Sequence, residues 1–249
     1  MFDLTAIATF HKEGMIAGAS FRSLLEAVEH SRSTLSLQVE IMLVLDRPDK
    51  FTLDFVSELA SAHSITVIES DFGDQGKSRN NAVLQSKGEY IAFLDGDDLW
   101  GYNWLTTAYE FIKSSSRTII AHPNYCVFFE NANSVLINID QEDPSFDLDY
   151  LRIGNYWDAM CMAHRNVHLD YPYCERNISR GIAYEDWHWN CETISAGIVH
   201  KVVPETIHFK RRQLTSQTIE ASSTHALMPR SKLTSYKEIG TLKENLEVA

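Results

Sequence analysis

The first hundred residues alternate between short apolar runs and helix-like segments, and this alternation constrains the fold more than any other feature. Apolar runs with the length and composition of buried strands occupy residues 4–9, 39–45, 65–68 and 89–94. The intervening segments, residues 15–30, 51–62 and 76–86, are interpreted as helices, the first two with apolar side chains near helical spacing. This order predicts an α/β fold with a mostly parallel central sheet and helices on both faces.

The second half of the chain is less regular and is expected to mix strands with fewer helices. The predicted strands are residues 118–121, 126–130, 135–139, 156–163, 199–203 and 206–210, with 126–130 and 135–139 forming a hairpin. The predicted helices are residues 102–113, 183–196 and a segment after Lys232. Because no repeat or low-complexity linker interrupts the chain, a single domain is the simplest interpretation, either alone or as part of a longer protein.

The charge balance and the cysteines exclude several classes of protein. The 249 residues carry 22 basic and 34 acidic side chains, a net charge of −12, which argues against nucleic acid as a partner. No stretch approaches the roughly 20 apolar residues of a membrane span, and the N-terminus does not resemble a secretory signal. Four scattered cysteines without C-x-x-C spacing are typical of a reduced, cytoplasmic protein.

Three carboxylates follow directly after the apolar run at residues 90–94, in the sequence Asp95-Gly96-Asp97-Asp98. Carboxylates at the end of a buried strand repel one another and lose hydration. A hard divalent cation relieves this cost, and oxygen ligands suit Mg²⁺ or Mn²⁺. Ligands of open α/β sheets also bind beyond the carboxyl ends of the strands. The turn therefore predicts a metal beside a phosphorylated ligand, the alternative being an ordinary solvated turn.

Several motifs around this turn resemble glycosyltransferase family 2. They are Gly76 with the pair Arg79-Asn80, the run 87–98 that includes Gly88-Glu89-Tyr90 and the acidic turn, the strand 40–46 ending in Asp46, and Tyr184-Glu185-Asp186-Trp187. The order and spacing are similar to those of the family over residues 4–212. The resemblance implies a GT-A fold, a Rossmann-like α/β sheet with a smaller acceptor-binding region. Residues 1–100 would be the nucleotide-binding half, 101–212 the acceptor-binding half and 213–249 a C-terminal lid or tail.

The resemblance also implies an activity: metal-dependent transfer of a sugar, with inversion, from a nucleoside diphosphate sugar to a glycan or lipid-linked acceptor. Family members make bacterial surface polysaccharides such as O-antigen and capsule. Because this sequence has neither membrane spans nor the Gln-x-x-Arg-Trp motif of processive synthases, we expect limited sugar addition by a cytoplasmic enzyme, soluble or peripheral at the inner membrane face.

Three residues are carried over as metal ligands. Asp97 is expected to coordinate the metal directly, and Asp95 to contact the ribose or reach the metal through water. Asp98 would orient the turn or contact the sugar. His208 would complete the site as in several GT-A enzymes, although a lone histidine is more often structural.

Five residues are expected to bind the nucleotide. Phe10 or His11 would stack on the base with Glu13 within reach, the alternative for Phe10 being core packing. Asp46 would accept the imide N–H of uracil or a base amine, or else cap a turn before Pro48. Arg79, at the start of a helix, would touch the diphosphate or the base, or form a surface ion pair.

Acidic and basic residues between positions 185 and 212, near the end of the segment that resembles the family, complete the expected site. Asp186 is the proposed general base, ionised without any change of pKa, and Glu185 would hold the acceptor; alternatively both acids only favour a helix N-terminus. Lys210, Arg211 and Arg212 would clamp the diphosphate when a loop closes, or remain solvated. Trp187 and Trp189 would line the acceptor site or pack in the core.

Three other classes of protein remain open. A sugar nucleotidyltransferase would carry a glycine-rich basic loop after the first strand, whereas residues 9–14 contain one glycine. A noncatalytic nucleotide-sugar-binding module would not need the acids at 95, 97 and 186. A glycoside hydrolase would use two carboxylates without a nucleotide-binding pattern.

Overall fold

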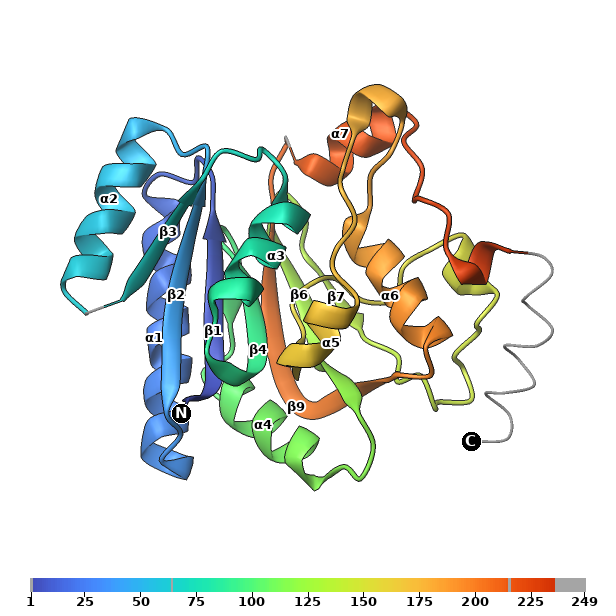
Figure 1. Cartoon of the computed structure of the whole chain (residues 1–249), viewed down its shortest axis with the longest axis horizontal. Coiled ribbons are helices and arrows are strands. Elements are labelled where there is room, and N and C mark those ends of the chain that lie inside the picture. Colours follow the sequence, from blue (N-terminus) through green and yellow to red (C-terminus); the bar gives the residue numbers. More distant parts are fainter. Residues whose placement is uncertain (1, 64, 215, 236–249) are drawn as a thin grey trace.

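A computed structural model describes residues 2–63, 65–214 and 216–235, and within these residues nine strands form one sheet (Figure 1). The order along the sheet is β3-β2-β1-β4-β8-β6-β9-β5, with β7 paired to β6. The strands are β1 Phe2–Phe10, β2 Val39–Asp46, β3 Thr66–Ser70, β4 Gly88–Asp95, β5 Leu99–Trp100, β6 Ile119–Glu130, β7 Ser134–Ile137, β8 Met162–His164 and β9 Val199–Arg212.

Four parallel strands form the first half of the sheet and place their carboxyl ends at one edge. β1 pairs with β2 and β4, and β2 pairs with β3, all in parallel. The register sets Phe10 beside Leu45 and Thr9 beside Asp95. The predicted parallel α/β sheet is therefore confirmed, and the ends of β1, β2 and β4 meet where the sequence predicted a ligand site.

Helices cover both faces of the sheet, as Figure 1 shows. They are α1 Ile16–Leu35, α2 Lys50–Ser61, α3 Gln75–Gln85, α4 Trp104–Ser114, α5 Arg165–Asp170, α6 Glu185–Ser195 and α7 Gln217–Ser223. One apolar core packs α1, α2 and α4 on side chains such as Leu4 and Leu43, and a second packs α3, α5 and α6 on Ile7 and Met42. This division follows from the alternation of side chains along each strand.

The structure corrects the predicted strands of the second half. Residues 118–121 and 126–130 belong to the one strand β6, which continues through an irregularity between Pro123 and Tyr125. The strands predicted at 199–203 and 206–210 likewise form the one strand β9. Of the strand predicted at 156–163, only Met162 and Ala163 are extended, within β8. Proline and polar breaks in sequence were overridden by the long parallel pairing of β6 with β9.

The C-terminal part contains two short helical elements among the described residues, and its role as a lid or tail stays a prediction. Residues 217–223 form the helix α7, for which the polar sequence gave no period, and Lys232–Thr234 form a single 3-10 turn. The rest of the helix expected after Lys232 lies outside the described residues. The helices in the described part of the chain are all too short or too polar to cross a membrane.

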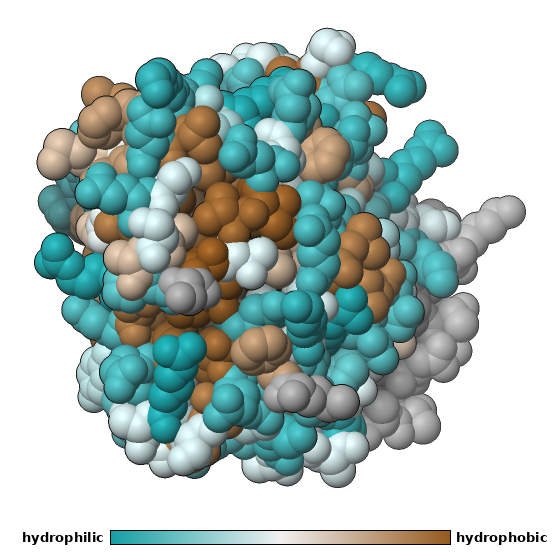
Figure 2. Space-filling view, turned by 60° about the vertical axis from the view of Figure 1, so that its left-hand side comes forward, coloured by the Kyte–Doolittle hydropathy of each residue, from teal (hydrophilic) through white to brown (hydrophobic). Residues whose placement is uncertain are grey.

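The side of the molecule that carries α2 and β3 is turned toward the reader in Figure 2, where apolar side chains gather between hydrophilic ones. On this side Phe51 of α2 is exposed and stacks on Phe55. Leu53, Leu59 and Val67 are partly buried against the core of α1 and α4. Apolar atoms make up about half or more of the surface of folded proteins, so this exposure by itself indicates no particular function.

Candidate active site

A cleft of about 850 Å³ opens at the carboxyl edge of the parallel strands. Thirteen of the sixteen residues considered for the site line it: Phe10, His11, Glu13, Asp46, Arg79, Asp95, Asp97, Asp98, Glu185, Asp186, Lys210, Arg211 and Arg212. These residues come from segments nearly two hundred positions apart, and the sheet brings them together. His208 is not among the lining residues described and lies buried behind the cleft.

Asp97 occupies the most strongly acidic part of the cleft. Burial, followed by the carboxylates of Asp98, Asp95 and Glu13, raises the pKa of Asp97 to about 7. Its Oδ2 accepts a hydrogen bond from Gln213 at 3.0 Å, a neutral donor that leaves most of the negative charge uncompensated. Clustered carboxylate oxygens with this deficit of positive charge fit a hard divalent cation.

Asp95 and Glu185 are joined through one buried arginine. Arg79 Nη2 donates to Asp95 Oδ1 at 2.6 Å, and Nη1 donates to Glu185 Oε1 at 3.2 Å. Burial alone would lower the pKa of Arg79, but the two carboxylates outweigh this effect and hold the pKa above its usual value. The guanidinium therefore stays charged. Arg79 thus links the acidic turn to the start of α6. Its predicted contact with the donor stays a prediction, and the alternative of a surface ion pair is excluded by its burial.

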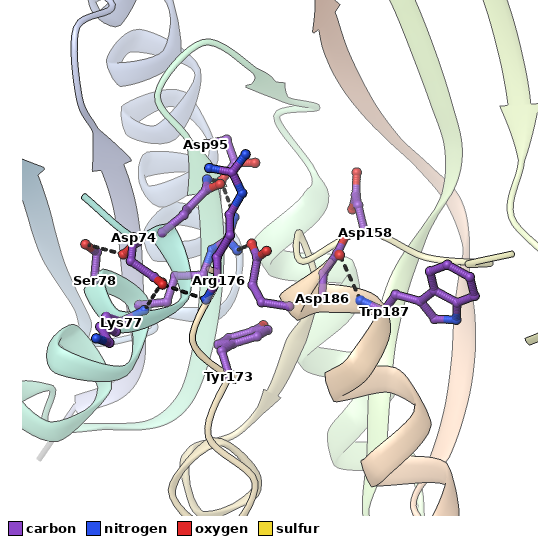
Figure 3. Close-up of polar contacts among 12 residues, drawn as sticks. Asp74, Lys77, Ser78, Asp95, Asp158, Tyr173, Arg176, Asp186 and Trp187 are labelled. Carbon is purple, nitrogen blue, oxygen red and sulfur yellow. Dashed lines mark hydrogen bonds and ion pairs between the residues drawn. The ribbon is translucent and has the colours of Figure 1, made fainter. Parts of the chain in front are cut away.

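Asp186 begins α6 beside Glu185, and its Oδ1 accepts the N–H of Trp187 at 2.7 Å (Figure 3). Burial and the neighbouring charge of Glu185 raise the pKa of Asp186 well above its usual range. The expectation that Asp186 keeps an ordinary pKa is therefore wrong, because the sequence does not show burial. A raised pKa makes this carboxylate more basic and suits proton abstraction near neutral pH.

The residue before these two acids has an unusual backbone. Tyr184 has φ = 65° and ψ = 56°, the left-handed region that few non-glycine residues adopt. This turn sets the direction in which α6 starts, so that Glu185 and Asp186 line the cleft. Backbone strain of this kind is often retained at functional sites.

Asp46 closes a loop at the end of β2. Its Oδ1 accepts the N–H groups of Phe72 and Gly73, and its Oδ2 accepts that of Asp74 at 2.9 Å. Although burial favours the neutral acid, these hydrogen bonds hold the pKa of Asp46 below its usual range. Asp46 therefore shapes the wall of the cleft formed by residues 72–74. A contact between Asp46 and a nucleotide base stays a prediction.

The end of β1 supplies Phe10, His11 and Glu13. Phe10 is 2% exposed and belongs to the core, in agreement with the packing alternative. His11 is exposed, and its Nδ1 lies 2.5 Å from the carbonyl oxygen of Asp46. Glu13 accepts the N–H of His11 at 2.6 Å, and burial raises its pKa. Of these three, His11 presents the more accessible ring for a base.

A buried charge network lies behind the acidic turn. His208 Nε2 is 3.4 Å from Asp98 Oδ2, and its Nδ1 is 3.7 Å from Asp158 Oδ2. Burial disfavours the imidazolium, yet the two carboxylates, Asp158 first, raise the pKa of His208 to about 10. A metal ligand must be a neutral imidazole. The role of His208 as a metal ligand stays a prediction; without a metal, the two acids favour the protonated ring.

The three basic residues at the end of β9 have different partners. Lys210 donates to Asp158 at 2.8 Å. The backbone N–H of Arg211 donates to Asp98 Oδ1 at 2.7 Å, and its side chain bonds the carbonyl of Asp97 and the carboxylate of Glu130. These contacts hold the acidic turn against β9, so Asp98 orients the turn. Arg212 lies 4.2 Å from the ring centroid of Phe128 and lines the cleft.

Three residues of the site were not predicted from the sequence. Asp158 lines the cleft from a loop, in a segment that was predicted as part of a strand at residues 156–163. Asp74 caps α3 by accepting the N–H of Lys77 at 2.8 Å, and it also accepts the N–H of Arg176 at 2.7 Å (Figure 3). The side chain of Arg176 pairs with Glu220 of α7 at 2.6 Å. An N-cap aspartate three residues before Lys77 is a signal that could have identified Asp74.

Both predicted tryptophans have structural roles. Trp189 is buried in the core and donates to the carbonyl of Tyr171 at 2.6 Å. Trp187 donates to the carbonyl of Leu151 at 2.6 Å. Neither is among the described residues that line the cleft, so the prediction that they form the acceptor site is not supported. Because they are two positions apart on α6, they face different clusters: Trp189 packs in the second core, and Trp187 packs against the cluster around Leu151.

The acidic cluster should destabilise the metal-free protein. The folded pKa of Asp97 is about 7, above the 3.8 of an unperturbed aspartate, so the folded state binds more protons and stability falls as pH rises between these values. We therefore expect Asp97→Asn to stabilise the metal-free protein at pH 8 by about 2 kcal/mol, less than the full shift because the side chain is partly exposed. Urea unfolding without divalent ions should show that the stability gained by Asp97→Asn shrinks toward pH 4. Equal stability of the variant and the unmodified protein at pH 8 would contradict this prediction.

Known proteins resemble this chain in sequence and in structure. Residues 6–171 match the family model of glycosyl transferase family 2. The chain is 25% identical over 139 residues to the Escherichia coli UDP-Glc:alpha-D-GlcNAc-diphosphoundecaprenol beta-1,3-glucosyltransferase WfaP, covering 56% of this chain and 53% of that protein. It therefore spans about half the length of this curated relative.

Solved structures share the fold. The crystal structure of S. aureus TarS 1–349 in complex with UDP-GlcNAc has a TM-score of 0.66 at 16% identity, covering 98% of this chain and 66% of that chain. The mannosyltransferase PcManGT from Pyrobaculum calidifontis, in complex with GDP-Man and Mn²⁺, has a TM-score of 0.62 at 13% identity. The match covers 100% of this chain and 70% of that chain. The fold is thus that of GT-A glycosyltransferases. With the family model matching more than half of its length, this chain belongs to glycosyl transferase family 2.

Proposed function

We propose that this chain transfers a sugar, with inversion, from a nucleoside diphosphate sugar to a glycan or lipid-linked acceptor. The observation that carries the proposal is the convergence of the acidic turn, the start of α6 and the basic end of β9 on one cleft. One part of the cleft suits a cation with a diphosphate, and another presents a basic carboxylate. The family match and the printed activity of the Escherichia coli relative support this assignment.

A divalent cation would be held by Asp97, with Asp95 beside it. The fit rests on the raised pKa of Asp97, which reflects carboxylates crowded without sufficient positive charge. When bound, Mn²⁺ or Mg²⁺ would supply Lewis-acid neutralisation of the departing diphosphate. Asp95 is already held by Arg79 and Gln75, each at 2.6 Å, so its orientation is fixed before any ligand arrives.

The proton chemistry is assigned to Asp186. Its carboxylate would accept the proton of the acceptor hydroxyl as that oxygen attacks the anomeric carbon. Glu185, paired with Arg79, would keep its negative charge beside Asp186 and thereby maintain the raised pKa of the base. Asp158 lines the same cleft and is placed to contact a hydroxyl of the acceptor or the sugar.

Calorimetric titration tests the proposal directly. UDP, GDP, dTDP and CMP would each be titrated into the whole protein with and without Mn²⁺. We expect one nucleotide to bind, and its affinity to depend on the metal. If none binds to the folded protein, the chain is better described as a noncatalytic module, and the proposal fails.

Arg212 is the expected contact for the diphosphate, because Lys210 and Arg211 are engaged by carboxylates. Arg212→Ala should weaken nucleoside diphosphate binding about tenfold, the usual size of a charge-assisted hydrogen bond to phosphate. Calorimetry should show little change in affinity for the corresponding nucleoside. Arg22, exposed on α1, offers the matched control, and equal effects of the two substitutions would remove Arg212 from the site.

A further inference from the structure

We propose that β7 is a self-association site, at which two copies of this chain pair edge to edge. This inference is independent of the proposed activity. β7 pairs with β6 through residues 134–137, and no second strand borders β7 within the described parts of the chain. An edge strand leaves alternate N–H and C=O groups without strand partners, and these groups are a template for another strand.

All four side chains of β7 are exposed, and the three that follow Ser134 are apolar. Val135, Leu136 and Ile137 are 61%, 46% and 62% exposed. Residues 131–139 contain no charged side chain, although the whole chain has a net charge of −12. Natural edge strands usually carry a charge, a proline or a bulge that prevents pairing. None of these protections is present on β7, whose four paired residues keep a regular register with β6.

The two ends of β7 differ in charge, and this difference favours a second copy in antiparallel orientation. At one end, Asn131 donates its N–H to the carbonyl of Arg212, so the basic end of β9 lies nearby. At the other end, the chain enters residues 140–149, which hold five acidic and no basic residues. Antiparallel pairing brings the acidic end of one copy toward the basic end of the other.

Antiparallel pairing also matches the apolar side chains. A two-fold axis beside Leu136, perpendicular to the sheet, sets this residue opposite its own copy, and Val135 opposite Ile137 of the second copy. The contact is isologous, as in most homodimers. Apolar pairs across strands contribute to pairing, and no charged residue meets a like charge at the axis.

A lipid surface explains these features less well. The open edge of a sheet does not enter hydrocarbon, because its backbone groups lose their hydrogen bonds. The acidic segment 140–149 follows three residues after β7 and would be repelled by anionic headgroups. A second strand satisfies the backbone groups and the apolar side chains at once.

Sedimentation velocity of the whole chain over a range of concentrations tests the inference. We expect a monomer–dimer equilibrium with a Kd on the order of 10–100 µM, because the contact is short. Leu136→Lys places two like charges next to the axis and should raise the Kd more than tenfold. Ile153→Lys, at a residue 79% exposed away from β7, should dimerise like the unmodified protein.

A mixture of Leu136→Lys and Leu136→Glu variants keeps the test decisive. Each variant alone should be monomeric, and the mixture should form dimers because opposite charges then meet near the axis. Thermal unfolding monitors that both variants fold. A chain that remains monomeric at the highest concentration, a Leu136→Lys dimer as stable as the original, or equal losses for Leu136→Lys and Ile153→Lys would each overturn the proposal. Vesicle binding without dimerisation would assign β7 to a membrane instead.

Discussion

Replacing Asp186 with asparagine is expected to lower the rate of sugar transfer by about 10²–10⁴-fold while leaving donor binding intact. The amide keeps the shape of the carboxylate but cannot accept the acceptor proton. Because burial and the charge of Glu185 already disfavour the ionised acid, the substitution should not destabilise the fold. Steady-state transfer rates and calorimetric affinity for the nucleoside diphosphate measure the two effects separately.

A pH series sharpens this experiment. The raised pKa of Asp186 should place the acidic limb of the unmodified enzyme's rate profile above the range of an ordinary aspartate, with activity lost as pH falls. Asp170→Asn, at an exposed position at the end of α5, is the matched control and should retain the activity. A near-normal rate for Asp186→Asn would assign the base to another residue.

Replacing Asp97 with alanine is expected to abolish metal-dependent donor binding and, with it, transfer. The substitution removes the proposed direct ligand, and Asp95 is a poorer substitute because its Oδ1 already accepts hydrogen bonds from both Arg79 and Gln75. We expect the affinity for a nucleoside diphosphate in Mn²⁺ to fall to its metal-free value, at least about 100-fold lower, as found when ligands or their supporting contacts are lost from metal sites.

Manganese binding followed by electron paramagnetic resonance separates loss of the metal from loss of the nucleotide. Asp54→Ala, at a carboxylate that is 61% exposed on α2, should bind metal and donor normally. If Asp97→Ala still binds Mn²⁺ with nucleoside diphosphate at the original affinity, Asp97 is not the ligand. We expect the Asp97→Ala variant to fold stably, because removing the Asp97 carboxylate relieves repulsion within the acidic turn.

Local sequence signals were sufficient for the first half of the fold. The apolar runs at 4–9, 39–45 and 89–94 became β1, β2 and β4 with shifts of one or two residues at their ends. Each run is long enough to be buried on both faces, and each is followed by a helix, so periodicity and connection rules leave few alternatives. The positions of Asp46 and Asp95 at the strand ends followed from the same pattern.

Pairing between distant segments decided the second half. β6 is twelve residues long and β9 is fourteen. The two strands pair along most of their length despite Pro123 and the polar residues of β9, because each strand supplies the other's hydrogen bonds. The strand propensity of a short stretch of sequence does not reveal which distant strand it will pair with. The polar helix α7 is likewise held by contacts such as Arg176 with Glu220, which the sequence alone does not reveal.

The sequence by itself determined the α/β class and singled out four acids that line the cleft, Asp95, Asp97, Glu185 and Asp186, because both inferences depend on residues close together in the chain; Asp74 and Asp158 were not predicted. The tertiary structure decided what each charge does. Arg79 and Arg211 were candidate donor contacts, yet burial commits them to carboxylates that hold the acidic turn and α6 in place. Asp97 and Asp186 acquire raised pKa values only when folding removes water and brings other acids near. Desolvation and charge pairing depend on three-dimensional neighbours, and no pattern of residue types along the chain specifies them.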